Sequence, residues 1–306
     1  MQESRLRTEV PQTSGNTGDL LSLRNILMAT DFSECSARAL NFALGIAARY
    51  ESRLNLFHCL DPRPYNMVGP DAVQSACDAA WRDMQQLEAE LRSNRLAKDV
   101  AVRALIEVGD LQAILPQVVA DLDVGLIVVG THGRTGWRKL VLGSVAEIVV
   151  DQASCPVLIV GPSNDQTRLQ KFGPENILFA SGPSAHSKLA EAYAFSLARK
   201  YGSHLTVVDV LEDHGGRVVA QASRLECCPP ELTSVTADKE VAHPVPLPSE
   251  FGERSDLILR VADETSADLI VLTVPGTQRF SDRFVSTNSY RVVCGAPCPV
   301  LTVRAH

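Results

Sequence analysis

The chain has 306 residues, a length that suggests two domains of ordinary size. Hydrophobic residues make up 45% of it and charged residues 21%, which is ample for buried cores. The net charge of −7 argues against a nucleic-acid partner, because binding to phosphates needs Lys and Arg that displace counterions. No apolar run reaches the roughly 18 residues of a membrane helix, and residues 1–19 lack the apolar core of a signal peptide. We therefore expect a cytoplasmic protein with no membrane partner and a disordered tail over residues 1–19.

Short apolar runs alternate with amphipathic stretches along the first half of the chain. Helices are expected directly after residue 33, over 75–96, over 110–120 and over 144–151, although Pro116 should kink or break the third of them. The strands expected between them are 25–29, 54–60, 100–106, 125–129 and 157–160. Continuous Val, Ile and Leu runs separated by helices predict an α/β domain with a five-stranded parallel sheet and helices on both faces.

The second half of the chain repeats the first. Residues 24–61 align with 175–212 without a gap and share 13 of 38 positions, and a second block pairs 155–158 with 298–301. The offset between the copies falls from 151 to 143, so the second copy is eight residues shorter in its middle. We expect tandem domains at 20–162 and 172–306, joined by a polar linker over 163–171.

The loop after the fourth strand has the pattern of a phosphate-binding site. Gly130-Thr131-His132-Gly133 follows the strand, and Gly143-Ser144 begins the next helix. Glycines there could adopt positive φ and let a ligand approach the backbone, and the helix N-terminus favours an anion. Ser144 could cap the helix and donate to a phosphate, while Arg134 and Lys139 could add positive charge. The alternative is that the glycines only shape a long loop.

The spacing Gly130-x2-Gly133-x9-Gly143-Ser144 resembles the ATP-binding signature of the universal stress protein family. Further resemblances are 29–33 to the family's first-strand end, 57–59 to its second and 155–158 to its last strand. The resemblance implies two flavodoxin-like, adenine-nucleotide-hydrolase-like domains in tandem. It also implies that ATP lies between the ends of strands one, two and four. It assigns the adenosine pocket to Ala29, Thr30 and Cys59, the ribose or Mg²⁺ to Asp31, and the phosphates and ribose to Gly130, Gly133, Gly143, Ser144 and Val145.

Several of these residues also have simpler interpretations. Asp31 could be only a helix cap, and Cys59, where the family usually has Val, could be only a core residue. His132 has no carboxylate partner in the sequence pattern, so a loop residue is favoured over a general base, and His58 is expected to be structural. The eight cysteines form no CxxC pair, and plain thiols are favoured over a metal or redox role, Cys227-Cys228 included.

The second copy departs from the signature. Gly182 stands in place of Asp31, and the loop after its fourth strand loses most of its glycines and gains a proline. At the positions equivalent to Gly130 and the residues after it, the second copy has Thr273, Val274, Pro275, Ser286 and Thr287, with Gly276 retained. We expect no ATP in this domain. Its proline-rich segment 214–249 reads as a surface loop, with a ligand or partner surface as the alternative.

The favoured interpretation is an ATP-binding protein with one competent domain and a regulatory or protective role in stress response. No acid–base or nucleophile–base pair is visible around the predicted phosphate-binding site, so at most slow ATP hydrolysis is expected. The resemblance implies an intramolecular pseudo-dimer through 156–160 and 299–303, with a homodimer of such chains as a further option. An adenylating enzyme of the adenine-nucleotide α-hydrolase group and a nucleotide-free scaffold remain alternatives.

Overall fold

The computed structural model describes most of the two repeated halves. The described residues are 23–65, 68–94, 97–131, 142–161, 173–181, 187–212, 218–226, 243–245, 254–274 and 288–304. The expected tail at 1–19 and the expected linker at 163–171 lie outside them.

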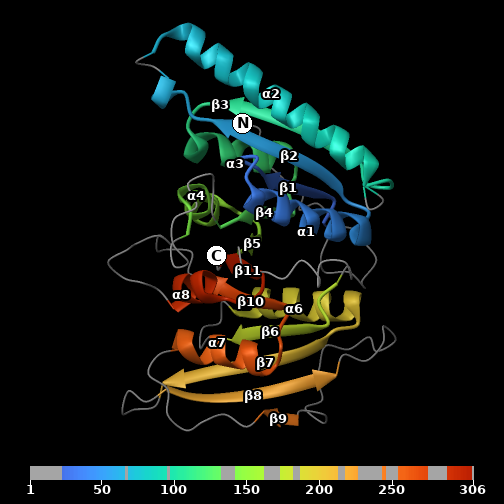
Figure 1. Ribbon diagram of the computed structural model, residues 1–306. Helices are drawn as coiled ribbons and strands as arrows, with labels where there is room; N and C mark the ends of the chain where they lie inside the picture. Colours follow the sequence, from blue (N-terminus) through green and yellow to red (C-terminus); the bar gives the residue numbers. More distant parts are fainter. Residues whose placement is uncertain are drawn as a thin grey trace, which may run out of the picture.

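The first half forms the predicted doubly wound domain (Figure 1). Its strands are all parallel and lie in the order β3-β2-β1-β4-β5. They are β1 (Asn25–Ala29), β2 (Arg53–Leu60), β3 (Val102–Val108), β4 (Leu126–Gly130) and β5 (Val157–Val160). Its helices are α1 (Glu34–Tyr50), η1 (Arg63–Tyr65), α2 (Pro70–Ser93), α3 (Leu111–Asp121) and α4 (Ser144–Gln152). Helix α3 continues through Pro116 and is not broken there.

Side chains alternate between the two faces of this sheet, so each face has its own core. Ile26 and Met28 pack with α1 and α2, whereas Leu27 and Ala29 pack with α3 and α4. The carboxyl ends of β1, β2 and β4 meet at one edge between these two layers, because the strands are parallel neighbours.

The second half repeats the inner part of this domain. Its parallel strands are β6 (Asn176–Ser181), β7 (His204–Glu212), β10 (Leu269–Val274) and β11 (Val300–Arg304). Helix α6 (Ser187–Tyr201) covers one face, and α7 (Arg254–Glu264) and α8 (Asn288–Gly295) cover the other.

The outer edge of the second half corrects the expected five-stranded parallel sheet and the expected surface loop. Strand β8 (Val218–Glu226) pairs antiparallel with β7, and β9 (His243–Val245) pairs antiparallel with β8. Gly215-Gly216 lies in the sequence between β7 and β8, and such residues favour hairpin turns. Prolines such as Pro229, Pro230 and Pro248 oppose a long helix, so no counterpart of α2 with its parallel strand forms among the described residues of this half.

The two halves join into one sheet of eleven strands, counted over the described residues. Strand β5 pairs antiparallel with β11, as expected for the pseudo-dimer, and Leu158 lies directly opposite Leu301. These two leucines occupy equivalent positions of the repeat, so a pseudo-two-fold axis passes between them. A second equivalent pair also meets: the rings of Tyr50 and Tyr201, at the ends of α1 and α6, contact edge to face with their centroids 6.3 Å apart.

Candidate functional site

The end of β1 places the predicted adenosine-pocket residues on two different faces of the sheet. Ala29 and Cys59 lie on the side of α3 and α4, where Ala29 is buried and Cys59 packs against the same core. The Thr30 side chain points to the opposite side, toward α1 and α2. Thr30 is thereby separated from the other two, and only its backbone remains at the shared edge, where its N–H donates to the carbonyl of Phe57 (2.9 Å).

Asp31 lies in the corner that turns the chain from β1 into α1. The Ser33 N–H donates to its Oδ1 (3.1 Å), and Ser33, not Asp31, caps α1 by accepting from the Ser36 N–H (3.2 Å). The half-buried carboxylate thus stands at the edge shared with β2 and β4, beside the start of a helix.

His58 holds this corner in place. Its Nδ1 lies 2.8 Å from the carbonyl oxygen of Thr30, and because a carbonyl can only accept, Nδ1 carries the proton. The imidazole also stacks on Phe32, with ring centroids 4.8 Å apart. Phe32 has a left-handed backbone (φ 61°), which is uncommon for a bulky residue and is held here by these contacts. The expectation that His58 is structural fits this geometry.

Glycine at position 130 allows close packing and does not provide the positive φ expected from the sequence. Its φ is not positive, so left-handed backbone is not the explanation. A Cβ at this position would come within 3.0 Å of the backbone carbon and oxygen of Cys35 in α1. Glycine therefore lets α1 pack closely on β4, where the Cys35 thiol donates to the carbonyl of Val160 (3.7 Å).

The N-terminus of α4 is the feature best suited to an anion. Gly143 is the N-cap, and no side chain caps the helix, so the expected capping by Ser144 is wrong. Gly143 has ordinary extended backbone (φ −65°, ψ 148°), and its N–H donates to the carbonyl of Thr131 (2.6 Å). Ser144 and Val145 are exposed at the first turn, where backbone N–H groups lack helical partners and the helix dipole favours negative charge.

The other residues of the predicted phosphate-binding site lie outside the described residues. This applies to His132, Gly133, Arg134 and Lys139, and in the second half to Gly182, Pro275, Gly276, Ser286 and Thr287. Cys227 and Cys228 lie outside them too.

Cys59 lies near the end of β2 as a half-buried thiol. Its thiol donates to the carbonyl of Gly109 (3.6 Å). Burial, and then the carboxylates of Glu107, Asp110 and Asp61, raise the pKa of the Cys59 thiol to about 11. At neutral pH the side chain is therefore an uncharged, weakly polar surface, as Val would be.

The second half reaches into the first-half site through Tyr290 of α8. The Tyr290 hydroxyl donates to Oε1 of Glu147 in α4 and accepts from the N–H of Leu142, both at 3.4 Å. Leu142 directly precedes the N-cap of α4. Sequence reasoning missed this contact, although the offset of 143 makes Tyr290 the counterpart of Glu147 and the pseudo-two-fold axis brings such counterparts together.

The corresponding strand end of the second half carries hydroxyl side chains. Thr273 replaces Gly130, and its Oγ1 is buried with no hydrogen-bond partner among the described residues. Ser289 of α8 donates to the Thr273 carbonyl (3.3 Å). The described part of this strand end therefore has threonine and serine where the first half has glycine and alanine.

Neither a membrane span nor a ready-made metal centre is found in the described part of the chain. None of its helices is both long and apolar enough to cross a bilayer. No group of three or more His, Cys, Asp or Glu side chains is placed there to hold a metal ion.

Comparison with known proteins relates both halves to one family. The model of the universal stress protein family matches residues 22–161 and 174–304. A universal stress protein of Staphylococcus epidermidis is 32% identical over 144 residues, which are 46% of this chain and 86% of that protein. A universal stress protein from Archaeoglobus fulgidus has the same fold, with a TM-score of 0.67 at 19% identity over 92% of this chain and 96% of its own. One in complex with cAMP gives a TM-score of 0.33 at 25% identity over 45% of this chain and 97% of its own. The chain belongs to the universal stress protein family and carries two of its domains in tandem.

Proposed function

We propose that the first domain binds ATP and that the second does not. The observation that carries this proposal is the N-terminus of α4, which starts at Gly143 without a side-chain cap. It lies after β4, whose neighbour β1 ends beside Asp31. Backbone N–H groups there suit phosphate oxygens, and Ala29 and Cys59 offer an uncharged wall to adenine. Gly133 and Arg134 complete the proposed cradle.

Asp31 would hold Mg²⁺ together with the phosphates. Mg²⁺ commonly binds one or two carboxylates and fills its other positions with phosphate oxygens and water. A single half-buried carboxylate beside a phosphate site meets that need. When bound, the ion would neutralise phosphate charge and could support slow hydrolysis.

A regulatory or protective role in stress response fits this site better than metabolic turnover. His58 is engaged with Thr30 and Phe32, and Cys59 is held as a neutral thiol, so neither is poised as a base or nucleophile. The six cysteines within the described residues are all free thiols, which supports a cytoplasmic location. Since β5 and β11 pair within the chain, a homodimer would use another surface.

Ligand-dependent melting of the full chain tests the proposal. Mg-ATP is expected to raise the Tm of the wild type, because a ligand that binds only the native state stabilises it. The Asp31→Asn variant should keep part of the ATP shift but lose its dependence on Mg²⁺. An unchanged Tm with ATP and a raised Tm with cAMP would replace ATP with another nucleotide. No shift with either would favour the scaffold alternative, and release of pyrophosphate with an acceptor would favour the adenylating enzyme.

A further inference from the structure

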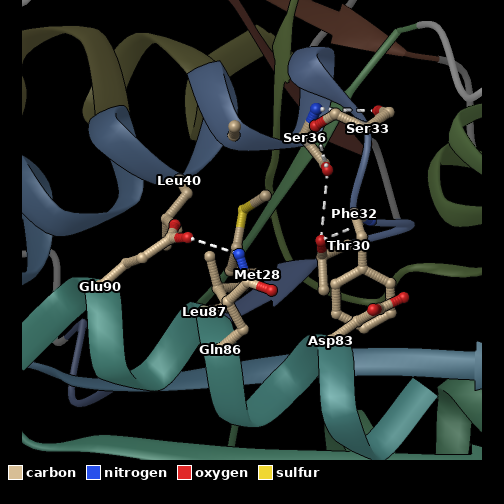
Figure 2. Close-up of a pocket in the computed structure, with 11 residues that line it drawn as sticks. Met28, Thr30, Phe32, Ser33, Ser36, Leu40, Asp83, Gln86, Leu87 and Glu90 are labelled. Atoms are coloured by element: carbon tan, nitrogen blue, oxygen red, sulfur yellow. Dashed lines mark hydrogen bonds between the residues drawn. The ribbon is translucent and has the colours of Figure 1, made fainter. Parts of the chain in front are cut away.

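A cavity of about 270 Å³ lies between α1, α2 and the end of β1 (Figure 2). It is on the opposite face of the sheet from Ala29 and Cys59, so it is separate from the proposed nucleotide site. Eleven residues line it. Seven come from β1, α1 and the connection between them, and four come from α2.

The cavity has an apolar floor, and Gln86 of α2, which also lines it, donates from Nε2 to Oε1 of Glu90 (3.0 Å). Met28 and Leu40 are buried, with exposures of 0% and 5%, and form its floor with the half-buried Leu87 of α2. Such a surface favours an aliphatic body over a water-filled space, because covering it removes apolar area from water.

Two carboxylates stand at opposite ends of this apolar floor. Asp83 and Glu90 both belong to α2 and are seven residues apart, so they lie on one helix face about 10 Å apart along its axis. Figure 2 shows Asp83 beside Phe32 and Thr30, and Glu90 beside Leu40, with Leu87 between them. The cavity therefore carries negative charge at both ends.

The hydroxyl groups of Thr30 and Ser36, which line the cavity, donate their hydrogens to acceptors within the protein. The Thr30 hydroxyl donates to Oγ of Ser36 (3.2 Å), and the Ser36 hydroxyl donates to the carbonyl of Ser33 (2.8 Å). Thr30 in turn accepts from the Phe32 N–H (3.0 Å). The hydroxyls of Thr30 and Ser36 therefore offer oxygen lone pairs and no hydrogen to a ligand, which favours a ligand rich in N–H donors and disfavours phosphate.

We propose that this cavity binds a linear aliphatic diamine. One ammonium group lies at Asp83 with the hydroxyl oxygens. The other lies at the Glu90 carboxylate, whose Oε1 also accepts from Gln86. The methylene chain crosses Met28, Leu40 and Leu87. This site goes beyond the proposed nucleotide binding and does not depend on it.

Cadaverine, a five-carbon diamine, is the probe, and the monoamine pentylamine of the same chain length is its control. The full chain is labelled at its methionine methyl groups, of which Met28 lines the cavity and Met84 does not. Cadaverine is expected to shift the Met28 signal in a saturable manner and pentylamine to bind about five-fold more weakly, since one exposed ion pair is lost.

Charge-removing variants on α2 locate the two ends of the ligand. Asp83→Asn and Glu90→Gln should each weaken cadaverine binding about five-fold, whereas Glu88→Gln, on the same helix but outside the cavity lining, should leave it unchanged. Melting of each variant checks that it folds. The proposal is overturned if cadaverine leaves the Met28 signal unchanged, if pentylamine binds as tightly, or if all three variants bind cadaverine alike.

Discussion

The two halves of this chain have the same inner strands and differ at the outer edge and at the strand ends. The first half completes its sheet with α2 and a parallel β3, whereas the second uses the antiparallel strands β8 and β9. At the end of the fourth strand the first half has Gly130 and the second has Thr273. The proposed nucleotide site and the α1–α2 cavity depend on features that the second half has replaced, so our proposal gives ligand binding to the first repeat alone.

The halves are nevertheless coupled, because equivalent residues meet across the pseudo-two-fold axis. Leu158 pairs with Leu301 in the sheet, and Glu147 accepts a hydrogen bond from Tyr290. Reciprocal contacts occur as well: Lys200 lies 4.9 Å from the centre of the Tyr50 ring, and its counterpart Arg49 lies 5.9 Å from that of Tyr201. The second half thus contacts the residues that lead into the proposed nucleotide site of the first.

The largest expected effect comes from giving the first half the residue of the second. Gly130→Thr would force a Cβ against the backbone of Cys35, and such overpacking costs about 1–3 kcal/mol of unfolding free energy. The displaced α1 should also abolish the ATP-dependent rise in Tm. Urea denaturation and melting with Mg-ATP measure both.

Thr273→Val is the matched variant in the second half. It removes a hydroxyl that is buried without a hydrogen bond in the described structure, so it should be neutral or stabilising and leave ATP binding intact. Equal destabilisation by the two variants would contradict the difference between the strand ends.

The next largest effect is a loss of ATP affinity without a loss of stability. Gly143 has backbone angles that any residue can adopt, so Gly143→Ala should fold normally and still weaken ATP binding about ten-fold by crowding the phosphates. Calorimetric titration measures the affinity. Ser286→Ala, at the equivalent place in the second copy, is the control, and an equal loss from both changes would refute the asymmetry.

A smaller effect is expected from the inter-domain hydrogen bonds. Tyr290→Phe removes a donor to Glu147 and an acceptor for the Leu142 N–H, at a cost of about 1 kcal/mol. ATP affinity should fall a few-fold, because Leu142 leads into the N-cap of α4. Tyr193→Phe, on α6, serves as control and should leave ATP affinity unchanged. Coupling between the domains is disproved if both variants bind ATP like the wild type.

The smallest effect is a pH dependence due to Cys59. An unfolded chain releases this thiol proton near pH 9.0, whereas burial and nearby carboxylates hold the folded-state pKa at about 11. The folded state therefore binds more protons between these values, and stability falls as pH rises through that window. In urea denaturation from pH 8 to 11, Cys59→Val should lose less stability than the wild type, and it should keep ATP binding. Parallel pH profiles of the two proteins would count against this account of Cys59.

The sequence was sufficient for the first domain and for the joining of the two halves. Apolar runs of Val, Ile and Leu predict the parallel sheet, the repeat predicts the tandem domains, and the family resemblance implies the pairing of β5 with β11. The hairpin edge of the second half was not predicted, because prolines and a shorter segment exclude a helix without specifying an antiparallel strand.

The candidate site was predicted at the level of strand ends but not of side-chain direction. Alternation along β1 sends Ala29 and Thr30 to opposite faces, and the sequence motif does not distinguish them. Gly130 matches a ligand-binding signature, yet its close neighbour is Cys35 of α1, a contact between residues distant in sequence. Tyr290 belongs to the other domain, so only the pseudo-two-fold relation between the copies could have indicated it.

The number of ATP molecules bound per chain tests the central claim most directly. Native mass spectrometry of the full chain with Mg-ATP reads this number, with Gly143→Ala and Ser286→Ala as the paired variants. One ATP per chain, much reduced by Gly143→Ala and unchanged by Ser286→Ala, is the predicted result. Two ATP molecules per chain, or one that is lost in Ser286→Ala and kept in Gly143→Ala, would contradict it.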